Sequence, residues 1–120
     1  MLTVVVGLAA GAGAVLRYVV DQLVQRRLVE FPAGTLLVNV TGSLVLGVVI
    51  GLSLHHGLPR TPTLVLSSGL AGGYTTLSTW AWETFALAEM GGRLEVAVNV
   101  AGSIAAGMVA GAAGLGLALL

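Results

Sequence analysis

The sequence predicts an all-helical membrane protein with four transmembrane helices, and three observations support this fold class. The chain of 120 residues is 57% hydrophobic and only 8% charged, whereas a soluble domain carries about 25% charged residues. Its charged residues leave four apolar stretches, each long enough for the roughly 20 residues that a helix needs to cross a bilayer. The third stretch also contains a cluster of glycines and hydroxyl side chains.

Composition excludes several classes of function. The formal net charge is zero, so there is no basic excess of the kind that binds nucleic acid. The chain has no cysteine, which removes disulfide frameworks, thiolate zinc sites and thiol redox chemistry. No nucleophile and base set or metal cluster that would indicate an enzyme is recognisable.

The charge-free stretches place a single transmembrane domain over residues 1–120, with spans at about 3–24, 32–56, 62–90 and 95–118. The first span lacks the basic start and the cleavage site of a signal peptide. The connectors are too short to hold a soluble domain; they are Gln25 to Phe31, Gly57 to Thr61 and Gly91 to Leu94.

The third span is expected to be broken in mid-membrane. Residues 67–76, with the sequence SSGLAGGYTT, hold three glycines and four Ser or Thr hydroxyls. Unwound backbone at that depth survives only where it is buried in protein or lines a cavity, where its carbonyls can hold a cation. The alternative is that the glycines only allow close helix packing. Small-xxx-small pairs elsewhere predict helix contacts; they are Gly7 with Gly11, Gly47 with Gly51 and Gly107 with Gly111.

A shared polar layer is the next expectation. Threading the spans puts the N-terminus and Arg60 on one face, here face A, and Arg26, Arg27 and Arg93 on the opposite face B. Each span then carries one polar residue roughly 10 Å below face B; these residues are Arg17, Asn39, Glu83 and Ser103. Such groups usually face a bundle interior or a wet cavity. Simpler alternatives are an interfacial pair of Arg17 with Asp21, neutralisation of Arg17 by Glu83, and an Asn39 that only links helices.

Polar stripes extend this layer along two helices. Asn99, Ser103, Gly107 and Gly111 recur every four residues, and Thr35, Asn39 and either Gly42 or Ser43 share a face of the second span. His55 and His56 lie at the face A end of that span, where an interfacial position is favoured over a metal site.

Three motifs of the sequence, which include Arg17 and Asn39 of the polar layer, resemble those of the CrcB or Fluc family of fluoride channels. Residues 11–18 (GAGAVLRY), 32–39 (PAGTLLVN) and 69–80 (GLAGGYTTLSTW) are similar to the three signature motifs of the family, in the same order and spacing. The third motif is highly specific, and the match spans the whole chain.

The resemblance implies a passive fluoride channel in the cell inner (plasma) membrane, which lets cytoplasmic fluoride leave the cell and reduces its toxicity. The family is an antiparallel dual-topology dimer with two pores and a structural sodium ion at its centre. Sodium would be held by the backbone carbonyls of Gly72 and Thr75. The implied pore-lining residues are Asn39, Thr76, Leu77, Ser78, Thr79, Trp80 and Ser103, and the implied vestibule and polar-track residues are Arg17, Glu83 and Asn99.

Two departures from the family pattern bear on the pore. Leu77 and Trp80 stand where the family normally has two phenylalanines, whose ring edges face the ion. Leu77 has no ring edge, whereas Trp80 keeps one and adds an indole N–H donor. Gly107 and Gly111 also stand where Ser or Thr is expected. Because some members of the family work as non-identical pairs, these departures and the three-to-one arginine bias leave a heterodimer with a paralogous subunit open beside the homodimer.

Two other classes of protein have a similar length and span count. A small dual-topology proton-coupled multidrug exporter needs a membrane-embedded carboxylate in its first helix, which here offers only Asp21 near its end. A non-catalytic membrane assembly subunit would explain the glycine faces and leave the polar layer unexplained.

Overall fold

The computed structural model describes residues 1–25 and 31–120, and the regular elements of these two ranges are all helical. In chain order they are α1 (Leu2–Gln25), α2 (Ala33–His55), α3 (Arg60–Leu64), the π-helix η1 (Val65–Ala71), α4 (Gly72–Tyr74), α5 (Ser78–Glu89), α6 (Arg93–Ala97), the π-helix η2 (Val98–Gly102) and α7 (Ser103–Leu117). Three continuous stretches are long and apolar enough to cross a membrane: Leu2–Gln25, Ala33–His55 and Arg93–Leu117. The pass from α3 to α5 is interrupted. The prediction of an all-helical chain with four helical passes is therefore confirmed.

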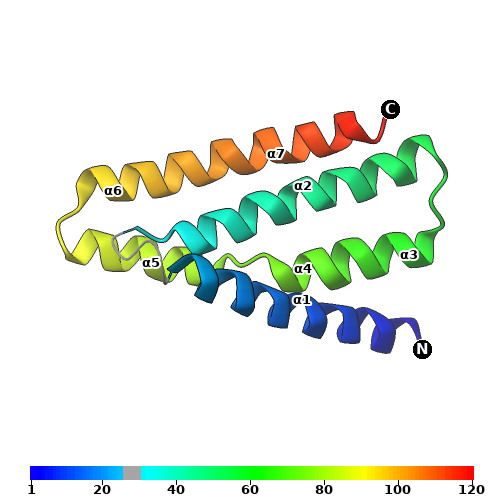
Figure 1. Ribbon diagram of the computed structural model, residues 1–120, viewed down its shortest axis with the longest axis horizontal. Coiled ribbons are helices and arrows are strands. Elements are labelled where there is room, and N and C mark those ends of the chain that lie inside the picture. The colour runs from blue at the N-terminus through cyan, green and yellow to red at the C-terminus, as the bar shows by residue number, and fades with distance from the viewer. Residues whose placement is uncertain (26–30) are drawn as a thin grey trace.

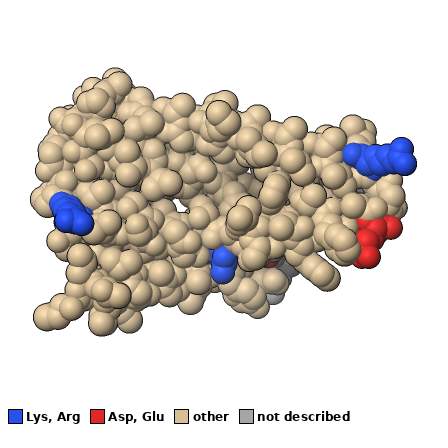
Figure 2. Space-filling model, turned by 180° about the vertical axis from the view of Figure 1, so that it is seen from behind, with Lys and Arg blue, Asp and Glu red and all other residues tan. Residues whose placement is uncertain are grey.

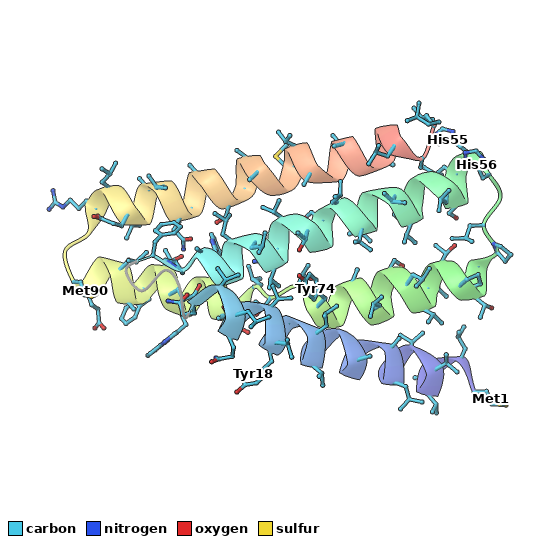
Figure 3. The ribbon with its side chains drawn as sticks, in the orientation of Figure 1. Met1, Tyr18, His55, His56, Tyr74 and Met90 are labelled. Carbon is cyan, nitrogen blue, oxygen red and sulfur yellow. The ribbon has the colours of Figure 1, made fainter. Side chains whose placement is uncertain are left out.

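The four passes run up and down along an elongated body of 48 × 29 × 21 Å (Figure 1). Met1, His55 and His56 lie at one end with the C-terminus, and Met90 lies at the other (Figure 3). Glycines at positive φ make the two tight turns, Gly57 at 66° and Gly91 at 78°, a conformation that costs other residues strain. Arg26 and Arg27, two of the three arginines assigned to face B, lie outside the described residues.

The surface is that of a multi-pass membrane protein. Figure 2 shows one face that is almost entirely uncharged, with isolated charged side chains mostly toward its two ends. Large apolar side chains are exposed along α1 and α7; they include Leu8, Val15, Met108 and Val109. Exposed apolar area on this scale is stable against lipid or protein and not against water.

Glycines set the closest helix contacts. On α2 and α7, a Cβ at Gly47 would overlap the Gly111 carbonyl, and a Cβ at Gly114 would overlap the Leu44 carbonyl. On the other side of the bundle, a Cβ at Gly13 of α1 would overlap the Leu70 carbonyl of η1. Without side chains at these positions, two pairs of helices approach backbone to backbone, which is how membrane helices gain packing energy.

The small-residue pairs did not all make the predicted contacts. The pair Gly47 and Gly51 packs against α7, as predicted. By contrast, no atom lies within 4 Å of a Cβ placed at Gly7 or Gly11, because both face away from the other described helices. Gly111 packs closely only through its backbone, since a Cβ placed there would first meet the Ser43 carbonyl at 3.7 Å.

The third pass breaks at Thr75–Leu77, at the C-terminal end of the segment in which a break was predicted. The glycines before it stay helical, with η1 wound as a π-helix. Their role is packing: a Cβ at Gly73 would overlap the Ala10 carbonyl, and one at Gly69 would lie 2.9 Å from Ala9 Cβ. The two interpretations of this segment therefore apply to different residues. The second π-helix, η2, was not predicted.

Because Gly114 sits on the α2 backbone, Gly114→Ala should force α2 and α7 apart. We expect a loss of about 1–3 kcal/mol of stability, measured as a lower melting temperature in detergent. Gly116→Ala is the matched control, since a Cβ there meets nothing within 4 Å. Equal melting temperatures for the two variants would contradict this packing.

Candidate pore-lining site

The centre of the site is a pair of hydrogen bonds between Asn39 and the break in the third pass. Asn39 Nδ2 donates to the Thr76 carbonyl at 2.9 Å, and the Thr76 N–H donates to Asn39 Oδ1 at 2.8 Å. Thr75 is extended, with φ −74° and ψ 159°, so the helical hydrogen bonds cannot continue through it. The Asn39 side chain thus replaces the helical partners of Thr76, because unsatisfied backbone groups are costly in a membrane.

Thr76 also bonds to the first turn of the next helix, α5, although it precedes the N-cap residue Leu77. Its Oγ1 accepts the Thr79 N–H at 3.2 Å, and it donates to Thr79 Oγ1 at 3.1 Å. Thr76 is 8% exposed. The break is therefore an ordered joint, closed by Asn39 on one side and by the first turn of α5 on the other.

Arg17 reaches the same joint from α1. Its Nη1 donates to the Thr75 carbonyl at 3.2 Å. Beside it is a cavity of about 230 Å³, here the arginine cavity, which is lined by both charged and hydroxyl side chains. Its lining is Ala14, Arg17, Tyr18, Asp21, Thr35, Val38, Thr76 and Thr79. Asp21 approaches the start of α2 so closely that a Cβ at Gly34 would overlap its carboxylate.

A smaller cavity of about 160 Å³, here the central groove, shares Thr76 with the arginine cavity. Its lining is Asn39, Ser43, Thr76, Leu77, Trp80, Ser103, Ile104 and Gly107. The Ser103 hydroxyl is buried and has no hydrogen-bond partner among the described residues. Asn39 donates only one of its two amide hydrogens to Thr76. The groove therefore offers unspent hydrogen-bond donors and has no carboxylate in its lining.

Ser43 connects the central groove to two larger neighbouring cavities. One, of about 320 Å³, reaches Gly72 and Thr75, and the other, of about 310 Å³, runs between Gly107, Gly111 and Leu46. These hollows follow one side of α2, between the third pass and α7. The two glycines of α7 leave the last hollow largely without polar atoms, as expected where Ser or Thr is missing.

The remaining polar-track residues, Glu83 and Asn99, form hydrogen bonds that were not predicted from the sequence. Thr35 Oγ1 donates to Glu83 Oε1 at 2.8 Å, and Asn99 Nδ2 donates to Thr84 Oγ1 at 2.9 Å. Arg17 and Glu83 thus have different partners, in place of the neutralising pair considered above. The indole N–H of Trp80 donates to the Asn99 carbonyl at 3.3 Å.

The structure divides the predicted pore-lining residues between two cavities. Asn39, Leu77, Trp80 and Ser103 share the central groove, Thr79 faces the arginine cavity, and Thr76 lines both. Ser78 is exposed and lines neither of these two. The polar residues at the site that were not predicted to line the pore are Thr35, Ser43, Tyr18 and Thr84. Spacing pointed to the first two, since Thr35 and Ser43 lie four residues on either side of Asn39.

The carbonyls of Gly72 and Thr75 could supply part of a sodium shell. Because the Thr76 N–H turns to Asn39, the Gly72 carbonyl loses the donor that a continuous helix would supply. Backbone carbonyls released in this way are typical sodium ligands in membrane proteins. The Thr75 carbonyl has a second lone pair besides the one that faces Arg17. Two oxygens from one chain leave the shell incomplete.

Comparison with known proteins gives consistent matches over almost the whole chain. The family model for CrcB-like protein, Camphor Resistance (CrcB), matches residues 4–115. A fluoride-specific ion channel FluC of Methylobacterium sp. (strain 4-46) is 44% identical over 107 residues, which cover 88% of this chain and 86% of the relative. Fluoride-specific ion channels FluC 1 of Leifsonia xyli and Frankia casuarinae are 44% and 48% identical, over 98% and 92% of this chain and 85% and 88% of their own lengths.

Asn39→Leu removes both partners of the Thr76 backbone while keeping the number and branching of the side-chain heavy atoms. We expect a loss of about 1–3 kcal/mol for each buried group left unsatisfied, seen as a lower melting temperature in detergent. Ser43→Ala, one turn further along α2, is the control, because it removes a hydroxyl from the same groove without touching the joint. If the two variants melt alike, Asn39 does not hold the break.

Proposed function

Because this chain belongs to the CrcB family, we propose that it is a passive, fluoride-selective channel through which cytoplasmic fluoride leaves the cell. The relatives named above are fluoride-specific ion channels, in line with the expectation that the chain is not an enzyme. The membrane concerned is the cell inner (plasma) membrane. Transport is downhill, so the chain needs no energy source and no titrating group on the path.

The observation that carries this proposal is the unspent donor set of the central groove. Buried hydroxyls normally have a partner, so one that has none among the described residues is available to bond a ligand. Ser103 Oγ is such a group, and it shares its cavity with the spare N–H of Asn39 and with Ser43. Donors without a nearby carboxylate suit a small anion that must exchange its hydration shell for hydrogen bonds.

Arg17 has a steering role in this proposal. Its guanidinium is one wall of the arginine cavity, and a positive charge there raises the local concentration of anions. The hydroxyl residues Thr76 and Thr79 line the same cavity beside the joint. Glu83 and Asn99 continue the polar track through their bonds to Thr35 and Thr84.

A second copy of the chain would complete the channel. The central groove is open on one side, and the Leu77 side chain beside it is 75% exposed. An antiparallel partner, as in a dual-topology dimer, would close the groove and supply a second pair of Gly72 and Thr75 carbonyls. The bound sodium ion would then supply a fixed positive charge that links the two subunits in a medium of low dielectric constant.

A heterodimer with a paralogous subunit is the second candidate, and Leu77 is the observation that favours it. Leu77 lines the central groove without an aromatic edge, so a partner with both rings would restore that contact. The exporter alternative has no comparable support. Asp21, the one carboxylate of α1, approaches Gly34 at the start of α2 instead of standing in mid-membrane.

Asn39→Asp should reduce fluoride efflux from proteoliposomes at least about tenfold, because a carboxylate would face the anion at short range in a medium of reduced dielectric constant. Efflux is followed with a fluoride electrode. The control is Thr61→Asp, which adds the same charge in the first turn of α3, far from the groove. Unchanged efflux would contradict Asn39 as a pore residue, and proton-coupled cation transport by the unaltered protein would contradict the channel.

Sodium depletion should weaken the proposed dimer. We expect the dimer fraction in detergent, measured by light scattering with size-exclusion chromatography, to fall when sodium is replaced by N-methylglucamine at constant ionic strength. Restoring sodium should restore the dimer. A dimer that is indifferent to sodium would contradict the carbonyl site.

A further inference from the structure

The Trp80 side chain is held by a closed ring of hydrogen bonds. Its indole N–H donates to the Asn99 carbonyl at 3.3 Å, and Asn99 Nδ2 donates to Thr84 Oγ1 at 2.9 Å. Thr84 Oγ1 in turn donates to the Trp80 carbonyl at 2.7 Å. Each of the three residues donates one of these bonds and accepts another, so they form one unit.

The ring links two consecutive passes. Trp80 and Thr84 lie one turn apart on α5, whose spacing puts them on the same face. Asn99 comes from η2 and is 1% exposed. Burying an amide at that depth is costly unless it is bonded. Single π-turns often occur at functional positions, and this one carries the acceptor for the indole.

This ring of hydrogen bonds also prevents the indole N–H from donating to a ligand in the central groove. Trp80 lines the central groove together with Leu77 and Ser103. Its only polar atom is already bonded to Asn99, and an indole nitrogen has a single hydrogen to donate. The indole can therefore present only its carbon-bound hydrogens and its bulk to the groove.

We propose that Trp80 is a fixed, non-donating wall of the central groove, and that Asn99 and Thr84 are positioning residues that hold it there. This inference rests on the proposed channel function. The donors for the anion are then the amide and hydroxyl groups of Asn39, Ser43 and Ser103. The indole sets the width of the groove opposite them, and its orientation depends on two residues that do not line the groove.

The hydrogen-bond ring is tested by the indole signal of Trp80 in ¹⁵N–¹H NMR spectra of the detergent-solubilised protein. Trp82→Phe leaves Trp80 as the only tryptophan and assigns its signal. In the protein with both tryptophans, we expect the Trp80 indole proton downfield of that of Trp82, which is 69% exposed. Thr84→Val should move the Trp80 signal upfield, and Thr84→Ser, which keeps the hydroxyl, should restore it.

Thr63→Val is the matched control for this spectrum. Thr63 also donates to a carbonyl one turn back, that of the N-cap residue Pro59 at 2.9 Å, but makes no hydrogen bond to another pass within residues 1–25 and 31–120. An indole signal that is the same in Thr84→Val and Thr63→Val would overturn the hydrogen-bond ring. So would a Trp80 proton that is not downfield of the Trp82 proton in the unaltered protein.

Fluoride efflux tests the positioning role. In Thr84→Val the loosened indole should obstruct the groove and lower efflux at least about threefold, whereas Thr84→Ser should match the unaltered protein. A shifted indole signal with unchanged efflux would overturn the positioning role. If the unaltered protein gives no efflux, the channel proposal fails, and the NMR comparison still decides whether the ring of hydrogen bonds exists.

Discussion

The hydrogen bonds between Asn39 and Thr76 are the constraint on which the site depends. A break in a membrane-spanning helix exposes backbone groups that lipid cannot satisfy. One amide side chain supplies both an acceptor and a donor to the Thr76 backbone, so the chain can leave the helix at this depth. The Gly72 carbonyl loses its helical donor, and the Thr75 carbonyl turns toward Arg17 as a result. The candidate cation ligands and the arginine cavity both follow from that pairing.

Glycine decides how close the passes come and where hollows remain. Gly13 and Gly73 bring α1 and the third pass into backbone contact, and Gly114 does the same for α2 and α7. These contacts fix two helix pairs firmly. Between the pairs, Gly107 lies beside Ser43 without a close backbone contact. The lack of a side chain at Gly107 therefore leaves space there and does not bring the helices closer. The same residue type therefore closes some contacts and opens the hollow that continues the central groove.

Much of this arrangement follows from the sequence. Absence of charge defined four passes, and the glycine and hydroxyl cluster located the break to within a few residues. The pairing of Asn39 with the Thr76 backbone was not predicted. Spacing could not separate glycines that pack from residues that unwind, because both roles use the same residue types; the contacts of Gly69 and Gly73 made that distinction. Pairwise bonds such as Thr35 to Glu83 and Asn99 to Thr84 also escaped prediction. They depend on the rotation of one helix against another, which a single sequence does not determine.

The surface that the chain leaves uncovered is consistent with the proposed second copy. Gly7 and Gly11 form a smooth strip on α1 that meets no other described helix, although small residues in a membrane helix usually serve close approach. Leu77 stands exposed beside a groove that one chain cannot close. Only four arginines lie in the connectors, three on face B and one on face A, so the preference for one insertion direction is modest. An antiparallel partner would pack on the glycine strip, close the central groove and complete the carbonyl shell. Lipid could cover the glycine strip but could not do the other two.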